Sequence, residues 1–312
     1  MNLCEIEKII KWFTSEHGEW IHNKKLVSWA ARLEIKLNLD RRLEDDQLFH
    51  LFVLAVLWNN KPTFPAKIGE QVFLEIRHNY TLKNFIEANQ NNNLAENLRN
   101  IARSTIGNKH IFSLLMYIAN GSINGEKVWT KIKQTINFPV IGNKEDDISR
   151  LRCLHGIFNP RKYEGESYLT VKTFLIFREI RIQFRDTGKY QYHPIICCIP
   201  DSNVRNALRT LNLMEKTGND INSLISASKI VAEQFCKDVY ELYDLPLFLW
   251  YKEKMKSHSL SEKVGEARQG APAGICPLCG SPLVWRRAKR THELYKGCTN
   301  FKDGCRWNDR SY

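Results

Sequence analysis

Residues 47–58 read QLFHLFVLAVLW, and this stretch decides the fold class. Gln47 and His50 are its only residues that are not apolar. A helix that is apolar around nearly its whole circumference is typical of one buried in the middle of a core. Turn residues at 59–62 (NNKP) follow at once and end the helix. The stretch therefore predicts a central helix enclosed by other elements.

Helical periodicity continues on both sides of that stretch and fills the first 255 residues. Strand signals are few, and residues 195–199 form only a short extended candidate. Turn residues separate the helical patterns, as at 120–121, 137–142 and 156–160. The further expected helices span residues 5–14, 25–36, 66–77, 82–88, 92–103, 108–118, 125–135, 145–154, 167–185, 202–213 and 220–242. We therefore predict an all-α domain over residues 1–255 with short connections.

The size and composition set broad limits on the class of protein. A chain of 312 residues suffices for one main domain and a small second one, and 43% hydrophobic content is ordinary for a globular protein. No window approaches the ~18 apolar residues of a membrane span, which excludes an integral membrane protein. The N-terminal residues include acidic side chains where a signal peptide needs a basic start. We therefore expect a cytoplasmic, monomeric protein with reduced cysteines.

The charge balance points to a polyanionic partner. The chain has 46 basic and 34 acidic residues, which gives a net charge of +12. Such a surplus favours binding to negatively charged molecules. Nucleic acid is favoured over a membrane surface, because no basic amphipathic helix stands out.

A composition change separates the two expected domains. Residues 256–275 lose the helical periodicity and gain Ser, Gly, Ala and Pro, which is typical of a flexible tether. Their basic residues could touch a polyanion, but we interpret the segment as a plain linker. Residues 276–312 follow it and carry four of the nine cysteines. The other five are scattered, and we interpret them as small buried hydrophobes.

The C-terminal cysteines have the spacing of a zinc site: C-x2-C, eighteen residues, then C-x6-C. Two thiolates separated by two residues can face one metal ion, and a second pair completes a tetrahedron. Between the pairs, residues 283–285 and 294–295 alternate like two short strands of a ribbon. A segment this short cannot build a core without a metal ion or disulfides. We therefore predict a structural Zn²⁺ ion bound by Cys276, Cys279, Cys298 and Cys305.

Residues 276–312 resemble the C-terminal zinc ribbons of bacterial type IA topoisomerases. The shared features are the CPLCG knuckle, a short strand, the YKGC sequence and a final cysteine. The resemblance implies DNA binding, often of single strands. Aromatic and basic side chains are interleaved here, which suits base stacking combined with phosphate contact. The phosphate-binding candidates are Arg286, Arg287 and Lys296, and the aromatic residues that either stack on bases or form the ribbon's small core are Trp285, Tyr295, Phe301 and Trp307.

Two segments of the helical domain resemble the helix-hairpin-helix DNA glycosylases, the superfamily of endonuclease III and the adenine glycosylase of mismatch repair. Residues 51–63 (LFVLAVLWNNKPT) are similar to the family's buried helix and the polar stretch beside its base pocket. Residues 193–208 (HPIICCIPDSNVRNAL) are similar to the apolar run that leads to the catalytic aspartate at the start of a helix. The family's pattern continues D-x-N/H-V-x-R-V-L, from which this chain departs at Asn206 and Ala207.

This resemblance implies catalysis by Asp201, and the residue types agree with that role. Asp201 follows Pro200 and precedes an expected helix, so it should lie at the helix N-cap, where free N–H groups favour a carboxylate. A fixed carboxylate can stabilise the positive charge that develops on a sugar as its base departs. The alternative is an ordinary capping aspartate. Such enzymes flip the base out of the helix, and the candidates to line its pocket, or else to serve as core and turn residues, are Trp58, Asn59 and Asn60.

The family's hairpin, a Leu-Pro-Gly-x-Gly turn whose amides bind a phosphate, corresponds to residues 154–165. The turn and phosphate candidates are Gly156, Arg161 and Lys162, with Arg205 a further DNA-binding candidate. Members that also cut the backbone place a Schiff-base lysine at the start of the next helix. Lys162 and Lys172 lie outside that lysine's usual motif, so we expect both to be solvated or phosphate-facing. The four cysteines of the family's iron–sulfur cluster have no counterpart in residues 202–275, which contain only Cys236.

The sequence thus predicts a helix-hairpin-helix glycosylase-like domain with a C-terminal zinc ribbon that binds DNA. The expected activity is hydrolysis of an N-glycosidic bond by a monofunctional DNA glycosylase, in base excision repair or in defence against phage DNA with modified bases. One alternative is a non-catalytic DNA-binding protein. Another is a nuclease or restriction-type subunit with a zinc ribbon, although no D…E-x-K metal motif was found on strands.

Overall fold

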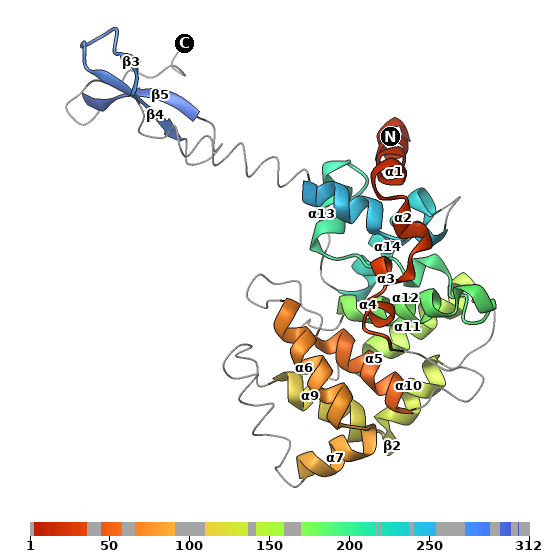
Figure 1. Ribbon diagram of the computed structural model, residues 1–312. Coiled ribbons are helices and arrows are strands. Elements are labelled where there is room, and N and C mark those ends of the chain that lie inside the picture. Colours follow the sequence, from red (N-terminus) through yellow and green to blue (C-terminus); the bar gives the residue numbers. More distant parts are fainter. Residues whose placement is uncertain are drawn as a thin grey trace. The chain divides into compact units, whose positions relative to one another are not determined.

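The computed structural model describes two units, Met1–Trp250 and Tyr251–Tyr312. The residues it describes are 3–35, 45–57, 66–90, 110–136, 142–158, 170–215, 218, 220–236, 240–253, 272–287, 294–300 and 305. Within these residues the first unit is built mainly of helices (Figure 1). The all-α class predicted for this part of the chain is therefore confirmed. None of the described helices combines the length and the apolar character that crossing a membrane requires.

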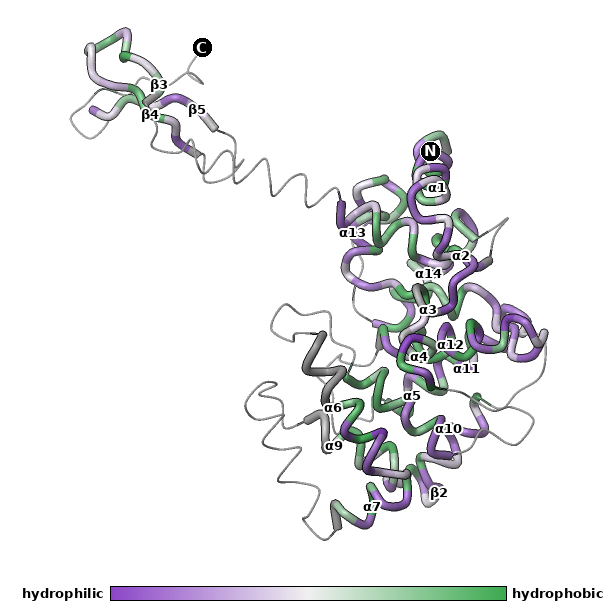
Figure 2. Tube along the Cα trace, viewed as in Figure 1, coloured by the Kyte–Doolittle hydropathy of each residue, from purple (hydrophilic) through white to green (hydrophobic). Residues whose placement is uncertain are grey.

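Helix α5 (Asp45–Leu57) is the centre of the first unit, as its sequence predicted. Every residue from Leu48 to Leu57 is buried, and the hydropathy colouring shows this part of the helix as mostly apolar (Figure 2). It packs against α6 (Ala66–Asn79), α7 (Leu82–Gln90), α9 (His110–Asn120) and α12 (Thr170–Gln183). A helix covered on all sides has no solvated face, which explains why its apolar pattern shows no polar stripe.

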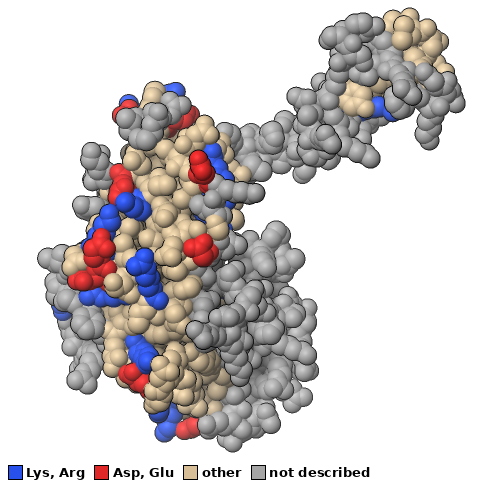
Figure 3. Space-filling model, turned by 180° about the vertical axis from the view of Figure 1, so that it is seen from behind, with Lys and Arg blue, Asp and Glu red and all other residues tan. Residues whose placement is uncertain are grey.

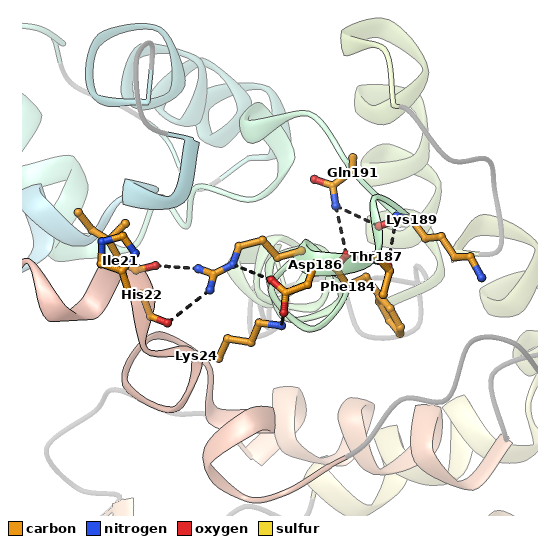
Figure 4. A network of polar contacts seen from close by, with 9 residues as sticks. Ile21, His22, Lys24, Phe184, Asp186, Thr187, Lys189 and Gln191 are labelled. Atoms are coloured by element: carbon orange, nitrogen blue, oxygen red, sulfur yellow. Dashed lines mark hydrogen bonds and ion pairs between the residues drawn. The ribbon is translucent and has the colours of Figure 1, made fainter.

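The N-terminal helices are α1 (Leu3–His17), α2 (Glu19–His22), α3 (Lys24–Val27) and α4 (Trp29–Arg32). Among them α4 packs against α12, and α1 packs against α14 (Ile221–Phe235). Arg185 follows α12 and its Nη1 donates to the Ile21 carbonyl at 2.7 Å, while Lys24 forms an ion pair with Asp186 (Figure 4). Arg185 and Asp186 both belong to η3 (Arg185–Thr187), a short 3₁₀ helix. The buried Glu179 carboxylate adds hydrogen bonds from Ser28 Oγ and from the Ala30 amide.

A small hairpin, β1 (Ser122–Ile123) and β2 (Glu126–Lys127), precedes α10 (Val128–Ile136). Asn124 and Gly125 form its turn with φ of 53° and 82°. Two consecutive positive φ angles are typical of the type I′ turn that joins two antiparallel strands, and Asn-Gly is its preferred sequence. The helix predicted over residues 125–135 is therefore wrong at its start. The helix predicted over residues 92–103 lies outside the described residues.

Helices α11 (Lys144–Phe158) and α12 lead to the segment that carries the candidate aspartate. The buried residues 194–200 begin with the 3₁₀ helix η4 (Pro194–Ile196), so the extended run predicted over residues 195–199 is wrong in its first part. Helices α13 (Ser202–Thr210) and α14 (Ile221–Phe235) follow. The helix predicted over 220–242 ends at Phe235, and the chain continues with η5 (Tyr240–Leu242) and a helical segment over residues 245–253.

The second unit contains a three-stranded antiparallel sheet in the order β3-β4-β5. The strands are β3 (Pro272–Ile275), β4 (Pro282–Arg287) and β5 (Leu294–Cys298). The two ribbon strands predicted from the sequence correspond to β4 and β5. Strand β3 falls within the predicted linker 256–275, so that prediction is wrong for its last four residues, whose hydrogen bonds are shared with β4.

Candidate active site and metal centre

Asp201 is the N-cap of α13, as predicted from the sequence. Its backbone is extended, with φ −67° and ψ 179°, and its Oδ1 accepts a hydrogen bond from the Val204 amide at 2.9 Å. Buried residues 194–200 deliver it to this position. The free N–H groups and the dipole of the first helical turn favour a negative charge here. The carboxylate therefore has one fixed orientation at the end of an apolar segment.

The surroundings of Asp201 weaken this preference for the charged form. Burial raises the pKa of Asp201 to about 6, and the nearby Asp244 carboxylate adds to this increase. Hydrogen bonds from the Val204 and Asn203 amides, together with the Arg178 charge, oppose it. A carboxyl group with a pKa near 6 is ionised at neutral pH but resists ionisation more than an ordinary aspartate, which is typical of groups at functional sites.

A second capping aspartate in the same chain provides a direct comparison. Asp220 caps α14 and accepts hydrogen bonds from the Asn222 and Ser223 amides at 3.1 and 3.0 Å. Its side chain is exposed, and the hydrogen bond from Ser223 Oγ lowers its pKa below the ordinary value. The pKa values of Asp201 and Asp220 therefore shift in opposite directions although both side chains cap helices. The difference lies in the burial of Asp201, so capping alone does not account for its environment.

The segment before Asp201 is held by hydrogen bonds from three other elements. Ser228 Oγ of α14 donates to the Ile195 and Cys198 carbonyls at 2.6 and 2.9 Å. Asp147 of α11 accepts from the His193 amide at 2.6 Å. Asp244, which follows η5, accepts from the Ile199 amide at 2.7 Å. The backbone leading to the candidate carboxylate is therefore fixed along its whole length.

Lys172 differs most from the prediction made for it. It lies in the first turn of α12, its side chain is buried, and its Nζ donates to the Val56 carbonyl near the end of α5. Burial lowers the pKa of Lys172 to about 7. The expectation of a solvated or phosphate-facing lysine is therefore wrong, because apolar helices enclose the amine. A lysine in such surroundings is partly neutral at physiological pH and can act as a nucleophile.

This burial has a consequence for stability that can be measured. The pKa of Lys172 is about 7 in the folded chain and ordinarily 10.5, so between these pH values the unfolded chain binds a proton that the folded chain does not. The free energy of unfolding should therefore rise with pH across this window, by an amount on the order of 4 kcal/mol. Lys172→Met should remove this increase in urea unfolding measured from pH 7 to pH 10.

Wild type and variant should be compared by difference, since cysteine and tyrosine side chains titrate in the same range. Lys83→Met is the matched control, because the Lys83 side chain is 82% exposed. Parallel stability curves for wild type and Lys172→Met would show that the amine is charged in the folded protein.

Of the remaining hairpin and pocket candidates, Gly156 and Arg205 lie within the described residues. Gly156 lies in the last turn of α11, exposed and without a positive φ, so it does not form the predicted turn. The helix continues to Phe158 instead of breaking at residue 156. Arg205 is half-buried in α13, and its Nη1 donates to the Gly218 carbonyl at 3.0 Å. The candidates Trp58, Asn59, Asn60, Arg161 and Lys162 lie outside the described residues.

The structure brings the four predicted metal ligands together in the second unit. The Sγ atoms of Cys276, Cys279, Cys298 and Cys305 all lie within 4.8 Å of one another. The pair Cys276–Cys305 is 3.6 Å apart and the pair Cys279–Cys298 is 3.4 Å apart. Tetrahedral Zn²⁺ with thiolate bonds of about 2.3 Å requires sulfur atoms about 3.8 Å apart. The cluster therefore fits a metal ion of this size, with Gly280 at φ +70° completing the knuckle turn.

The basic residues of the ribbon have defined positions on its strands. Arg286 Nη2 donates to the Cys298 carbonyl at 3.0 Å, and the Arg286 side chain lies across Gly297, where an added Cβ would be 2.8 Å from the Arg286 Cδ. Lys296 Nζ lies 5.3 Å from the centre of the Trp285 ring, which faces it from the neighbouring strand. Arg287 ends β4. This hydrogen bond links the Arg286 side chain of β4 to the end of β5, which carries the candidate ligand Cys298.

Two buried charged residues near Asp201 were missed by the sequence analysis. Arg178 Nη1 of α12 forms an ion pair with Asp244 Oδ1 at 3.0 Å, with both side chains 6% exposed. Arg178 stands in the sequence FLIFREIRIQ, where charged and apolar residues alternate without helical periodicity. Neither residue belongs to a recognisable motif, so only their proximity in the folded chain reveals them.

Comparisons with known proteins do not extend this description. No protein-family model matches the sequence, and no curated protein or solved structure matches it.

Proposed function

We propose that this protein is a DNA glycosylase that hydrolyses the N-glycosidic bond of a damaged or modified base, with Asp201 as its catalytic carboxylate. The observation that supports this most directly is the environment of Asp201. A rigid, buried segment ends in this carboxylate, one of whose oxygens is fixed by the Val204 amide. Its pKa, raised to about 6 by burial, leaves it charged at neutral pH in surroundings of low polarity.

The reaction requires a negative charge of this kind. As the base departs, the sugar C1′ becomes an oxocarbenium-like centre with developing positive charge. A carboxylate that is already oriented and only partly exposed to water, as Asp201 is, stabilises this charge more strongly than a fully solvated one. The same carboxylate can accept a hydrogen bond from the attacking water molecule and so position it. The target base has to leave the helix to reach such a site, which favours bases that pair weakly.

The ribbon supplies the second part of the proposal, DNA binding around a structural Zn²⁺ ion. The four cysteine sulfur atoms lie within 4.8 Å of one another. Four thiolates would complete the tetrahedral coordination of Zn²⁺ and leave no position for substrate, which suits a structural role. Lys296 and Arg286 lie among the aromatic residues Trp285 and Tyr295 on paired strands. On the face of the helical unit seen in Figure 3, by contrast, basic and acidic side chains are interleaved. We therefore assign DNA binding to the ribbon and base excision to the helical unit.

The environment of Lys172 favours a second candidate, a glycosylase that also cuts the DNA backbone. The amine is buried, its pKa is lowered by burial to about 7, and it contacts Val56, which lies two residues before the expected base pocket. A neutral amine could displace the base by attack on C1′ and form an imine, whose elimination breaks the strand. This activity would differ from hydrolysis in its product, since the strand breaks without added alkali.

A glycosylase assay tests both candidates. Duplex and single-stranded DNA containing candidate modified bases would be incubated with the protein and then analysed with and without alkali. Breaks that need alkali support hydrolysis, and breaks that appear without alkali and disappear in Lys172→Gln support the second candidate. DNA binding without abasic sites in any substrate would favour a non-catalytic DNA-binding protein. Cutting that requires a divalent metal ion would favour a nuclease.

The pH dependence of excision follows from the environment of Asp201. The charged carboxylate is the active form, and burial raises its pKa to about 6, so single-turnover excision should lose activity as the pH falls through about 6. An ordinary aspartate, with a pKa near 4, would place this limb about two pH units lower. Rates measured at saturating protein between pH 4.5 and pH 8 decide between these values. A rate that is constant down to pH 4.5 would contradict the assignment.

A further inference from the structure

The Asp244 carboxylate makes two hydrogen bonds in the interior of the first unit. Its Oδ1 accepts from the Ile199 amide at 2.7 Å and from Arg178 Nη1 at 3.0 Å. Asp244 is 4% exposed and Arg178 is 5% exposed. The Oδ1 atom of Asp244, in the turn after η5, therefore connects Arg178 in the middle of α12 with the backbone of Ile199, just before Asp201.

The link from Ile199 to Asp201 is short and stiff. Only Pro200 separates the two residues, and its ring fixes φ near −65°. The Asp201 amide also donates to the Ile199 carbonyl at 2.9 Å, which closes a tight turn around Pro200. On its other side Asp201 is held by the first turn of α13. A displacement of the Ile199 amide is therefore transmitted to the Asp201 carboxylate.

The same pair also contributes to the charge around Asp201. The charged groups that act on Asp201 are Asp244 from the η5 end, Arg178 from α12 and Arg205 from its own helix. Asp244 raises the pKa of Asp201, whereas Arg178 lowers it. Removing the negative charge of Asp244 should therefore favour the ionised form of Asp201.

A buried ion pair is a costly way to obtain stability. The desolvation of both charges offsets most of their attraction, and well-packed apolar residues often serve as well. What an apolar pair could not supply is a hydrogen-bond acceptor for the Ile199 amide. The arrangement is thus better suited to fixing the position of a backbone segment than to stabilising the fold.

We propose that Asp244 and Arg178 are positioning residues, which hold the Ile199 amide and thereby orient Asp201 towards the reacting sugar. This inference rests on the proposed glycosylase activity. The pair should increase the rate of base excision even when Asp201 is fully ionised, because it holds the carboxylate in the correct orientation. In this proposal both residues act through the backbone of residues 199–201.

Two substitutions separate the positional effect from the charge effect. Asp244→Asn keeps an oxygen acceptor for the Ile199 amide and removes the charge, whereas Asp244→Ala removes both. Asp244→Leu also removes the acceptor and the charge while it fills a similar volume, and it serves in place of Asp244→Ala if that variant does not fold. Asp147→Asn is the matched control, because Asp147 is also buried, is paired with Arg150 at 2.5 Å, and holds the His193 amide at the other end of the same segment.

Three measurements give distinct expected results. In Asp244→Asn the midpoint of the Asp201 titration, followed by carboxyl ¹³C NMR, should fall by about half to one pH unit, and the acid limb of excision should move with it. In Asp244→Ala the Ile199 amide should exchange its hydrogen at least about tenfold faster. The single-turnover rate at pH 8, where Asp201 is ionised in every variant, should fall about 10- to 100-fold. Asp147→Asn should leave the Asp201 midpoint unchanged.

A rate within twofold of wild type at pH 8 in Asp244→Ala, or an Ile199 amide that exchanges as slowly in Asp244→Ala as in the wild type, would overturn the proposal. So would equal shifts of the midpoint in Asp244→Asn and Asp147→Asn, since these would indicate a general response to losing a buried pair. The exchange and titration measurements need no substrate. They therefore still test the link between Asp244 and Asp201 if the wild type excises no base, a result that would count only against the proposed activity.

Discussion

Asp201→Asn is expected to reduce the single-turnover rate of base excision by about a thousandfold while DNA affinity changes little. Asparagine is nearly isosteric and remains a good N-cap, so its oxygen can still accept the hydrogen bond from the Val204 amide. The substitution therefore removes the negative charge and leaves the helix start in place. Only the stabilisation of the developing positive charge on the sugar is lost, and this stabilisation acts in the transition state.

The matched control is Asp220→Asn, which makes the same change at the N-cap of α14. Asp220 is exposed and its pKa is lowered by the hydrogen bond from Ser223 Oγ, so its charge serves the helix alone. We expect wild-type excision from this variant, with at most a small loss of stability. Rates should be measured with protein in excess over DNA, so that they report chemistry and not product release. Full activity in Asp201→Asn would exclude Asp201 as the catalytic carboxylate.

Cys298→Ser is expected to abolish zinc binding and to unfold the ribbon while the helical unit stays folded. Within the described part of the ribbon, the buried core consists of Cys298, Cys276 and Leu283. A core this small needs a further source of stability, and we expect a bound metal ion to supply it. Structural zinc sites in small domains contribute about 10 kcal/mol or more to folding, so the loss of one thiolate has a large effect. Metal content per chain and the dispersion of the ribbon amide resonances should both fall.

The effect on function should be confined to DNA binding. Affinity at low salt should drop by about tenfold or more, since an unfolded ribbon no longer holds its basic and aromatic side chains in fixed positions. The excision rate at saturating DNA should stay close to that of the wild type. Cys4 and Cys153 are exposed, so the burial predicted for the scattered cysteines is wrong for these two. Cys4→Ser, outside the cluster, should change neither metal content nor affinity. If excision at saturating DNA were lost while the helical unit stayed folded, the assignment of DNA binding to the ribbon and of excision to the helical unit would be wrong.

Features encoded in local sequence patterns were predicted well. The buried position of α5 follows from a run of apolar residues that no solvated helix could carry. The four clustered thiols follow from the cysteine spacing, and the N-cap role of Asp201 follows from the proline before it and the helix after it. In each of these the physical cause lies in a sequence pattern of at most about 30 residues.

Predictions were less successful where the cause lies elsewhere in the chain. The β1–β2 turn did have a local signal, Asn124-Gly125, but the neighbouring Asn120-Gly121 was interpreted as the break. Strand β3 has no such signal, since its sequence is PAGI and its pairing partner β4 decides its conformation. The burial of Lys172 depends on packing against α5, more than a hundred residues away along the chain. The Arg178–Asp244 ion pair likewise joins residues that are 66 positions apart. Such contacts cannot be inferred from one sequence.

The hydrogen bonds of Glu179 also bear on the order in which the first unit is made. Its carboxylate accepts from Ser28 Oγ, across a sequence separation of 151 residues, and from the Ala30 amide. During synthesis the N-terminal helices therefore leave the ribosome long before the helix that completes their packing. Native contacts of such high sequence separation slow folding and leave apolar surface uncovered in the meantime. The N-terminal helices therefore reach their final arrangement late, α4 after α12 has emerged and α1 after α14 has emerged.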